Sequence, residues 1–321
     1  LQTQGVGRLG LAVRDEDLLG RLPQRTQPVK QVGLIPVGRQ PLDLRHLGEK
    51  YLKERLPFIC ELAKAYVGVD PVKEPIPVRP TAHYTMGGIE TDAKCATRMP
   101  GLYAAGECAS VGLHGANRLG SNSLSEIVVF GKVAGEQAAE FAATQQHGNT
   151  EALAAKAEAL IKQHLSLMDI HGTENPADIR NELGMSMEAG VGIYRTEELM
   201  QGTIDKINEL KARYKKIKIN DKSSVFNTDL LYAIELGYML DVAEAMAHSA
   251  INRKESRGSH QRLDGYEERD DVNFLKHTLS FYAPEGAPTI DYSDVKITKS
   301  QPAKRVYGSE GEKQDEAKKN G

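Results

Sequence analysis

The chain has no tryptophan among its 321 residues and only three cysteines, Cys60, Cys95 and Cys108. Their spacing matches no metal-ligand pattern, so it argues against a cysteine metal site and indicates free thiols in a reducing compartment. The formal net charge of −3 indicates neither nucleic acid nor an anionic membrane as a partner. No apolar run approaches the roughly 20 residues of a membrane-spanning helix, and we expect no signal peptide. What remains is a chain long enough for two domains or for one large one.

A Gly-x-Gly-x-x-Gly fingerprint that follows a strand and opens a helix is also absent, so the sequence shows no dinucleotide-binding unit. What is present is a concentration of site-forming residues between positions 80 and 130. This segment contains the imidazole of His83, the guanidinium of Arg118, several glycine turns and a helix start near Ser123. No other part of the chain concentrates as many such groups.

The helix start is marked by a Ser-x-x-Glu pattern from Ser123 to Glu126, directly followed by the apolar residues 127–130. The pattern predicts a capping box, in which Ser123 accepts from the N–H of Glu126 and Glu126 reaches back to the N–H of Ser123. Arg118 would then lie in the loop at the positive end of the helix. A helix N-terminus beside a guanidinium fork favours a carboxylate. The alternative is a capped surface helix with a solvated Arg118.

Residues 101–107 are predicted to form a short buried strand that ends in Gly106 and Glu107. In an open α/β sheet, ligands bind at the carboxyl ends of the strands. Gly106 would allow close approach of the backbone to a ligand, and Glu107 could accept hydrogen bonds from cofactor hydroxyls. By itself this motif is unspecific.

Taken together, these motifs resemble the flavoprotein subunits of the succinate dehydrogenase/fumarate reductase family, bacterial fumarate reductase above all. L-Aspartate oxidase is a more distant relative. The similarity runs from about residue 42 to residue 308. It is carried by the motifs at residues 79–88, 106–108, 114–124, 224–229, 253–260 and 269–271.

The resemblance implies roles for residues at the matching positions. His83 and Arg118 are expected to bind the carboxylates of the substrate, and Glu107, Ser123 and Leu124 are expected to contact FAD. In fumarate reduction the flavin passes a hydride to one alkene carbon, and positive groups on the carboxylates orient the double bond. For His83 taken alone, the alternative is a core histidine with satisfied hydrogen bonds.

The implied fold is an α/β FAD-binding portion of sheet plus helices, then an α-helical domain and a small C-terminal α+β segment. The expected divisions are an atypical segment without family match over 1–41, the end of a capping-domain-like region over 42–76, the C-terminal part of the FAD-binding domain over 77–146, the helical domain over 147–255, the small C-terminal domain over 256–307 and a disordered tail over 308–321. Apolar periodicity predicts helices over 49–67, 151–168, 176–190, 197–218 and about 230–250.

Some family features have no counterpart in the sequence. We find neither the Rossmann-type unit with the histidine that carries FAD covalently nor the Gly-Pro-Arg-Asp-like stretch with the proton-donating arginine. No catalytic residue is therefore assigned, and no metal ligand. The change of character near Leu42 suggests a C-terminal portion whose first residues come from a different reading frame or start.

The predicted function is that of a fumarate reductase flavoprotein subunit, an oxidoreductase of CH–CH bonds that interconverts fumarate and succinate with FAD in anaerobic respiration. The alternatives are a succinate dehydrogenase flavoprotein, an L-aspartate oxidase relative, or an inert fragment that retains only partner-binding surfaces. We expect this polypeptide alone to be inactive.

By resemblance, the partners are an iron–sulfur subunit and membrane anchor subunits, with the chain peripheral on the cytoplasmic face of the inner membrane and with no nucleic acid bound. The charged stretch 253–260 allows two interpretations. It is either a phosphate site or, as we favour, a polar loop against the flavin domain.

Overall fold

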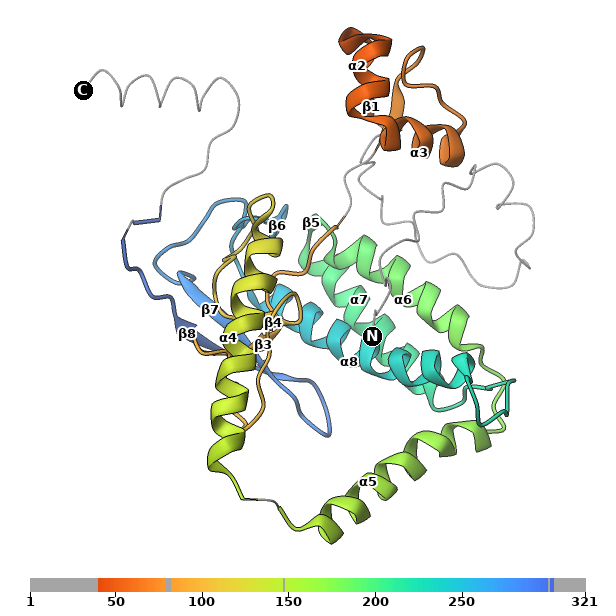
Figure 1. Ribbon diagram of the computed structural model, residues 1–321, viewed down its shortest axis with the longest axis vertical. Coiled ribbons are helices and arrows are strands. Elements are labelled where there is room, and N and C mark those ends of the chain that lie inside the picture. The colour runs from red at the N-terminus through yellow and green to blue at the C-terminus, as the bar shows by residue number, and fades with distance from the viewer. Residues whose placement is uncertain (1–39, 79–81, 147, 300, 303–321) are drawn as a thin grey trace. The chain divides into compact units, whose positions relative to one another are not determined.

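The computed structural model describes residues 40–78, 82–146, 148–299 and 301–302 (Figure 1). The predicted atypical segment 1–41 and tail 308–321 lie almost entirely outside the described residues, as do Arg79, Pro80 and Thr81 of the first motif. The chain divides into two compact units. Unit 1 comprises the chain up to Ala154 together with Met185–Ile193, and unit 2 comprises Ala155–Gly184 together with the chain from Tyr194 onward.

The first part of unit 1 is a pair of helices whose preceding and following segments pair as a two-stranded ribbon. Strand β1 (Gln40–Leu42) pairs antiparallel with β2 (Ile76–Val78). Between them lie the 3₁₀ helix η1 (Arg45–Leu47) and the helices α2 (Gly48–Arg55) and α3 (Pro57–Val67). The single helix that we predicted over 49–67 is thus two helices. Proline lacks an N–H donor and clashes with the preceding turn, so Pro57 ends one helix and begins the next.

The second part of unit 1 contains two very short parallel strands and one long helix. Strand β3 (Ile89–Glu90) pairs with β4 (Ala109–Ser110), and helix α4 spans Asn122–Thr144. The close approach of the two strands needs a glycine at position 88. Gly88 has a φ of 126°, and a Cβ there would lie 2.4 Å from the carbonyl oxygen of Cys108.

The strand predicted over 101–107 is wrong. Only Tyr103 takes part in a ladder there, as an isolated bridge to Ala96, and the strand forms later, at Ala109–Ser110. Gly101 and Gly106 explain the difference. Both have positive φ angles, 83° and 85°, which turn the backbone out of the extended conformation at each end of the segment.

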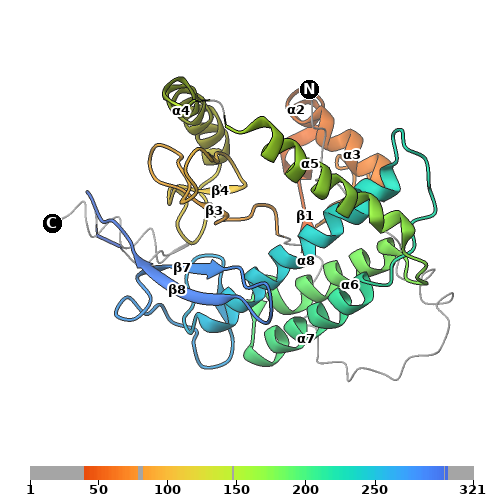
Figure 2. The ribbon, with the colours of Figure 1, turned by 90° about the horizontal axis from the view of Figure 1, so that it is seen from below.

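Unit 2 is built mainly from helices, with short strands at its end. Its elements are the remainder of α5 (Thr150–Leu165), η2 (Ser166–Asp169), α6 (Pro176–Val191) up to Gly184, β5 (Tyr194–Arg195), α7 (Glu197–Tyr214), α8 (Thr228–Asn252), β6 (Gln261–Arg262), β7 (Lys276–Phe281) and β8 (Thr289–Asp294). The helices predicted from periodicity are confirmed to within a few residues. Strands β7 and β8 form an antiparallel hairpin (Figure 2). The hairpin agrees with the strands that we expected in the small C-terminal α+β segment, but the described residues of 256–307 contain no helix.

The core of unit 2 lies between α7 and α8. Buried side chains of α7 face buried small and branched residues of α8: Met200, Ile204, Ile207 and Leu210 from α7, and Ala233, Leu236, Leu240, Ala243 and Ala247 from α8. The two helices start at side-chain caps. Thr196 accepts from the N–H of Leu199 at 3.3 Å, and Asn227 accepts from that of Leu230 at 2.8 Å.

Replacing Gly237 in α8 with alanine should destabilise unit 2 by about 1–2 kcal/mol, because overpacking exceeds the gain in helix propensity. The added Cβ would lie 2.8 Å from the Tyr214 hydroxyl oxygen, which is itself held by a 2.8 Å hydrogen bond to the carbonyl of Ala233. The matched control is Gly202→Ala in α7, where nothing lies within 4 Å of the new Cβ. Urea denaturation followed by circular dichroism should show the control equal to or above the parent. Equal midpoints for both variants would contradict this packing argument.

Candidate functional site

The start of α4 differs from the predicted capping box. Ser121 stands before the helix with a left-handed φ of 66°, and no side chain caps the first turn. Ser123 and Glu126 therefore lie inside the helix. The carboxylate of Glu126 does not reach back to the backbone because it is only 2% exposed and binds the side chains of Tyr84 and His114 instead. A buried carboxylate is costly unless it is paired, so these partners take precedence over an exposed cap.

Three polar side chains meet at one point of unit 1, and we call them the Tyr84 cluster: the partly buried Tyr84 and the buried side chains of His114 and Glu126. The hydroxyl of Tyr84 donates to Oε2 of Glu126 at 2.9 Å, and Nε2 of His114 lies 2.5 Å from the same oxygen. The rings of Tyr84 and His114 pack edge to face, with centroids 5.4 Å apart. Burial, together with the hydrogen bond to Glu126, raises the pKa of Tyr84 to about 12, so its hydroxyl remains a donor at neutral pH.

Arg118 lies on the ring of Tyr84. The central carbon of its guanidinium is 4.5 Å from the ring centroid, a distance typical of a cation–π contact. One terminal nitrogen, Nη1, donates to the carbonyl of Leu119 at 3.1 Å. Its Nε is buried and has no hydrogen-bond partner among the described residues. The side chain is thus held in place while a donor remains for an acceptor from outside.

Two other predicted site residues, His83 and Glu107, lie close to Tyr84. His83 is exposed, which excludes the alternative of a satisfied core histidine. Glu107 accepts from the backbone N–H of Thr85 at 3.0 Å, so its carboxylate is tied to the same loop and remains accessible. The loop 82–85 therefore has His83 beside Tyr84, Arg118 on the tyrosine ring and Glu107 at its end.

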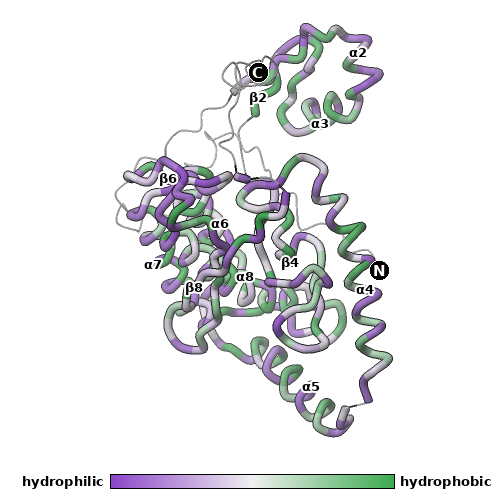
Figure 3. The backbone as a smooth tube through the Cα atoms, turned by 90° about the vertical axis from the view of Figure 1, so that its left-hand side faces the viewer, coloured by the Kyte–Doolittle hydropathy of each residue, from purple (hydrophilic) through white to green (hydrophobic). Residues whose placement is uncertain are grey.

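The first turn of α4 carries the last two predicted residues. Ser123 is half-buried and Leu124 is 64% exposed. Hydrophobic and hydrophilic bands alternate along this helix in Figure 3. Its exposed apolar side chains include Ile127 and Val128. An exposed leucine next to an uncapped helix start offers apolar contact and partial positive charge side by side.

Sequence reasoning did not identify Tyr84, His114 or Glu126 as parts of one cluster. A signal for Glu126 was present, because it lies one helical turn before Phe130 and residues four apart share a helix face. The two other members carried no such signal.

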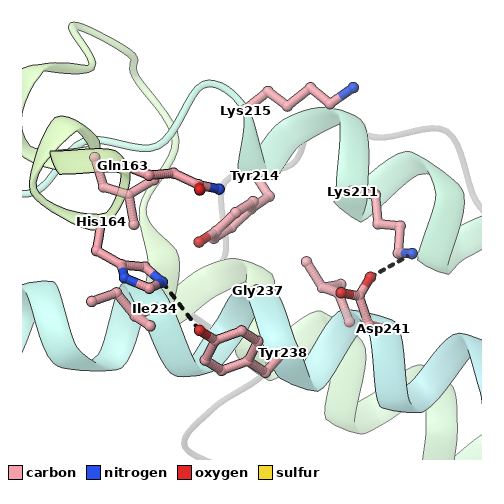
Figure 4. Close-up of a pocket in the computed structure, with 11 residues that line it drawn as sticks. Gln163, His164, Lys211, Tyr214, Lys215, Ile234, Gly237, Tyr238 and Asp241 are labelled. Atoms are coloured by element: carbon pink, nitrogen blue, oxygen red, sulfur yellow. Dashed lines mark hydrogen bonds and ion pairs between the residues drawn. The ribbon is translucent and has the colours of Figure 1, made fainter. Parts of the chain in front are cut away.

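Unit 2 contains a separate pocket, shown in Figure 4, with a volume of about 340 Å³. Its polar groups largely pair with one another: His164 with Tyr238 at 3.1 Å and Lys211 with Asp241 at 2.8 Å. No predicted site residue lines it. In the described part of the chain we find no cluster of three or more side chains suited to a metal ion.

The charged stretch 253–260 forms an internal network and not an open phosphate site. Glu255 is fully buried and binds both Arg253 and Arg257, at 2.6 and 2.8 Å. Arg257 also pairs with Asp271 at 2.7 Å. With these guanidinium groups engaged inside the protein, the interpretation as a polar loop fits better.

Comparison with known proteins adds the family. Residues 180–307 match the model of the fumarate reductase flavoprotein C-terminal region, and residues 23–124 match that of an FAD-binding domain. The chain is 70% identical over 279 residues to the fumarate reductase flavoprotein subunit of Serratia sp. (strain ATCC 39006), covering 87% of this chain and 47% of the relative. For the Escherichia coli K12 subunit the identity is 68% over 277 residues, with 86% and 46% covered.

This chain belongs to the fumarate reductase/succinate dehydrogenase flavoprotein family. It spans about half the length of the curated relatives it matches. The succinate dehydrogenase flavoprotein subunit of Rickettsia bellii is 41% identical over 286 residues, with 83% of this chain and 47% of the relative covered.

Solved structures agree with this assignment. A mutant of E. coli quinol fumarate reductase superposes with a TM-score of 0.80 at 69% identity, over 83% of this chain and 46% of that one. A quinol-fumarate reductase with menaquinol molecules gives a TM-score of 0.79 at 68% identity, over 82% and 46%.

The predicted family and the FAD-binding character of its first part are confirmed by these matches. We expected the similarity to start near Leu42, but the FAD-binding match begins earlier, at residue 23. Within the described parts of the chain, no helix has the length and apolar character to cross a membrane.

The residues present fit one part of an FAD site. The first turn of α4 has no side-chain cap, so its partial positive charge is open to a negatively charged group. Two of its N–H groups are engaged locally, since Asn122 donates to Leu119 and Leu124 donates to Ser121. Glu107 is exposed and keeps oxygen lone pairs that can accept from hydroxyl groups.

Proposed function

We propose that this chain forms the substrate-binding part of a fumarate reductase flavoprotein subunit that interconverts fumarate and succinate with FAD. The observation that carries the proposal is the state of Arg118. Its guanidinium is held over the ring of Tyr84 with a buried Nε that lacks a partner among the described residues, beside the exposed His83. An arginine in this state can grip a carboxylate with a charge-assisted hydrogen bond.

In this proposal the chain's residues divide into two groups. Arg118 and His83 bind the two carboxylates, hold the carbon–carbon bond in one orientation and stabilise the charge that develops beside it. Glu107, Ser123 and Leu124 contact FAD, which supplies the hydride when it is bound. We assign no proton donor, because the sequence contains no Gly-Pro-Arg-Asp-like stretch.

Fumarate reductase is favoured over succinate dehydrogenase by similarity. The fumarate reductase relatives reach 70% identity, whereas the Rickettsia bellii succinate dehydrogenase subunit reaches 41%. We also propose, from the quinol-fumarate reductase complexes among its relatives, that the chain works with iron–sulfur and anchor subunits at the cytoplasmic face of the membrane. An inert fragment that keeps only partner-binding surfaces is the alternative.

The test is dicarboxylate binding by the purified full chain supplied with FAD, measured by titration calorimetry with succinate. Arg118→Met should weaken binding at least about tenfold, because one charge-assisted hydrogen bond is worth about 1.5–3 kcal/mol. The matched control is Arg45→Met, whose guanidinium is exposed and pairs only with the nearby Asp43 among the contacts described. Equal affinities for parent and Arg118→Met would overturn the proposal. Viologen-linked fumarate reduction on the same samples then separates an active site from an inert binding surface.

A further inference from the structure

Two members of the Tyr84 cluster, His114 and Glu126, have no role in the function proposed above, although both side chains are buried. The side chains of His114 and Glu126 are 8% and 2% exposed. Burying a carboxylate costs several kcal/mol unless its oxygens are hydrogen-bonded. Glu126 meets this condition at Oε2, to which both Tyr84 and His114 bind.

The cluster restricts the ring of Tyr84 from two sides. The hydrogen bond to Glu126 fixes the hydroxyl at 2.9 Å, and the edge of His114 packs against the ring at an interplanar angle of 89°. One face of the ring then carries the guanidinium of Arg118. A phenol that donates to a carboxylate is polarised, so its ring face becomes a better acceptor for a cation.

Two polar atoms, one in the Tyr84 cluster and one in the adjacent Arg118, lack a hydrogen bond among the described residues. A purely structural network would be expected to pair them. Nε of Arg118 and Nδ1 of His114 are buried and have no hydrogen-bond partner in the described part of the chain. A buried donor without a partner is destabilising. For Arg118 that cost is recovered when an acceptor arrives.

We propose that Glu126 and His114 position Arg118 through the ring of Tyr84, so that its guanidinium meets a substrate carboxylate in one orientation. The proposal rests on the proposed function as far as the substrate is concerned. The positioning itself is a property of the free chain and can be measured without any dicarboxylate.

The first experiment observes Arg118 in the free chain by NMR. Protons that lie over an aromatic ring are shifted upfield, so Arg118 side-chain signals should be shifted in the parent and should lose that shift in Tyr84→Leu. In Tyr84→Phe the ring remains but the hydrogen bond is lost, and the Arg118 Nε–H signal should broaden. Glu126→Gln keeps an amide oxygen for Tyr84 but removes the charge. In this variant, too, the Arg118 Nε–H signal should broaden. The control is Tyr66→Phe, an exposed tyrosine of the same unit.

The second experiment is a double-mutant cycle on succinate affinity. Tyr84→Phe should weaken binding about fivefold in the parent and have no further effect in the Arg118→Met background. Equal losses in both backgrounds would show that Tyr84 acts independently of Arg118 and would overturn the inference. Arg118 signals that are identical in the parent, Tyr84→Phe and Glu126→Gln would also overturn it. If the parent binds no succinate at all, the proposed function fails and the NMR result still decides the positioning.

Discussion

Glu255→Ala should lower the free energy of unfolding of unit 2 by about 3–5 kcal/mol, the range expected when one partner of a buried ion pair is removed. Glu255 is 0% exposed and accepts from Arg253 at 2.6 and 2.9 Å and from Arg257 at 2.8 and 2.9 Å. It also accepts from the backbone N–H of Asp270 at 2.9 Å. Without this carboxylate, two largely buried guanidinium groups would lose their shared counter-charge.

The measurement is equilibrium denaturation of the full chain, followed by a signal from the helices of unit 2. The control is Glu209→Gln, which removes a half-exposed partner of Lys206 and should change the free energy of unfolding by less than about 1 kcal/mol. Glu255→Gln should lie between the two, since it keeps the shape and loses the charge. A Glu255→Ala variant as stable as the control would show that the Glu255 network makes no net contribution to the free energy of unfolding.

Lowering the pH from about 6.5 to about 4 should cost unit 2 roughly 3 kcal/mol through one histidine, His260. Burial first, and then the charge of Arg195, lower the pKa of His260 from 6.5 to about 4. Its Nδ1 lies 2.7 Å from Nη1 of Arg195, and its Nε2 lies 3.0 Å from the carbonyl of Arg253. The folded state therefore holds a neutral imidazole that accepts from one arginine and donates to a carbonyl.

The sign follows from the two pKa values. The unfolded chain takes up the proton near pH 6.5, while the folded chain takes it up only near pH 4. The stabilisation is complete above pH 6.5 and is lost as the pH falls through this window. Stability measured in denaturant at pH 7, 6, 5 and 4 should fall most steeply below pH 6.

The test variant is His260→Gln. Its loss in free energy of unfolding between pH 6.5 and 4 should be smaller than that of the parent by roughly 3 kcal/mol. The control is His171→Gln, an exposed histidine of the same unit, which should follow the parent. A His260→Gln curve parallel to that of the parent would assign the acid sensitivity to other groups. Asp271, whose pKa is lowered by its hydrogen bond with Arg257, contributes to both curves alike.

Both predictions concern residues whose motif was visible in the sequence while their pairing was not. Residues 253–260 could be read as a phosphate site or as a polar loop, because charge alone does not say whether an arginine faces solvent or a buried acid. The structure argues against the phosphate site, since Glu255 and Asp271 pair with the guanidinium group of Arg257.

In the site of unit 1, too, the sequence showed a motif but not which side chains pair. A Ser-x-x-Glu pattern before an apolar run is a local signal and predicted a cap at Ser123. Glu126 instead binds Tyr84, which is 42 positions away in the chain, and His114, which is 12 positions away. The strand predicted over 101–107 failed for a related reason, because two glycines with positive φ end the extended segment.

The sequence by itself determined the family, the helices of unit 2 and the set of residues around which a dicarboxylate and FAD site is proposed. Long motifs and apolar periodicity are local features, and these could be read along the chain. Only the tertiary structure decided which buried charges pair, where Arg118 rests and why Glu126 does not cap its helix. Those outcomes depend on the cost of burying polar groups, and that cost is set by segments that meet only after folding.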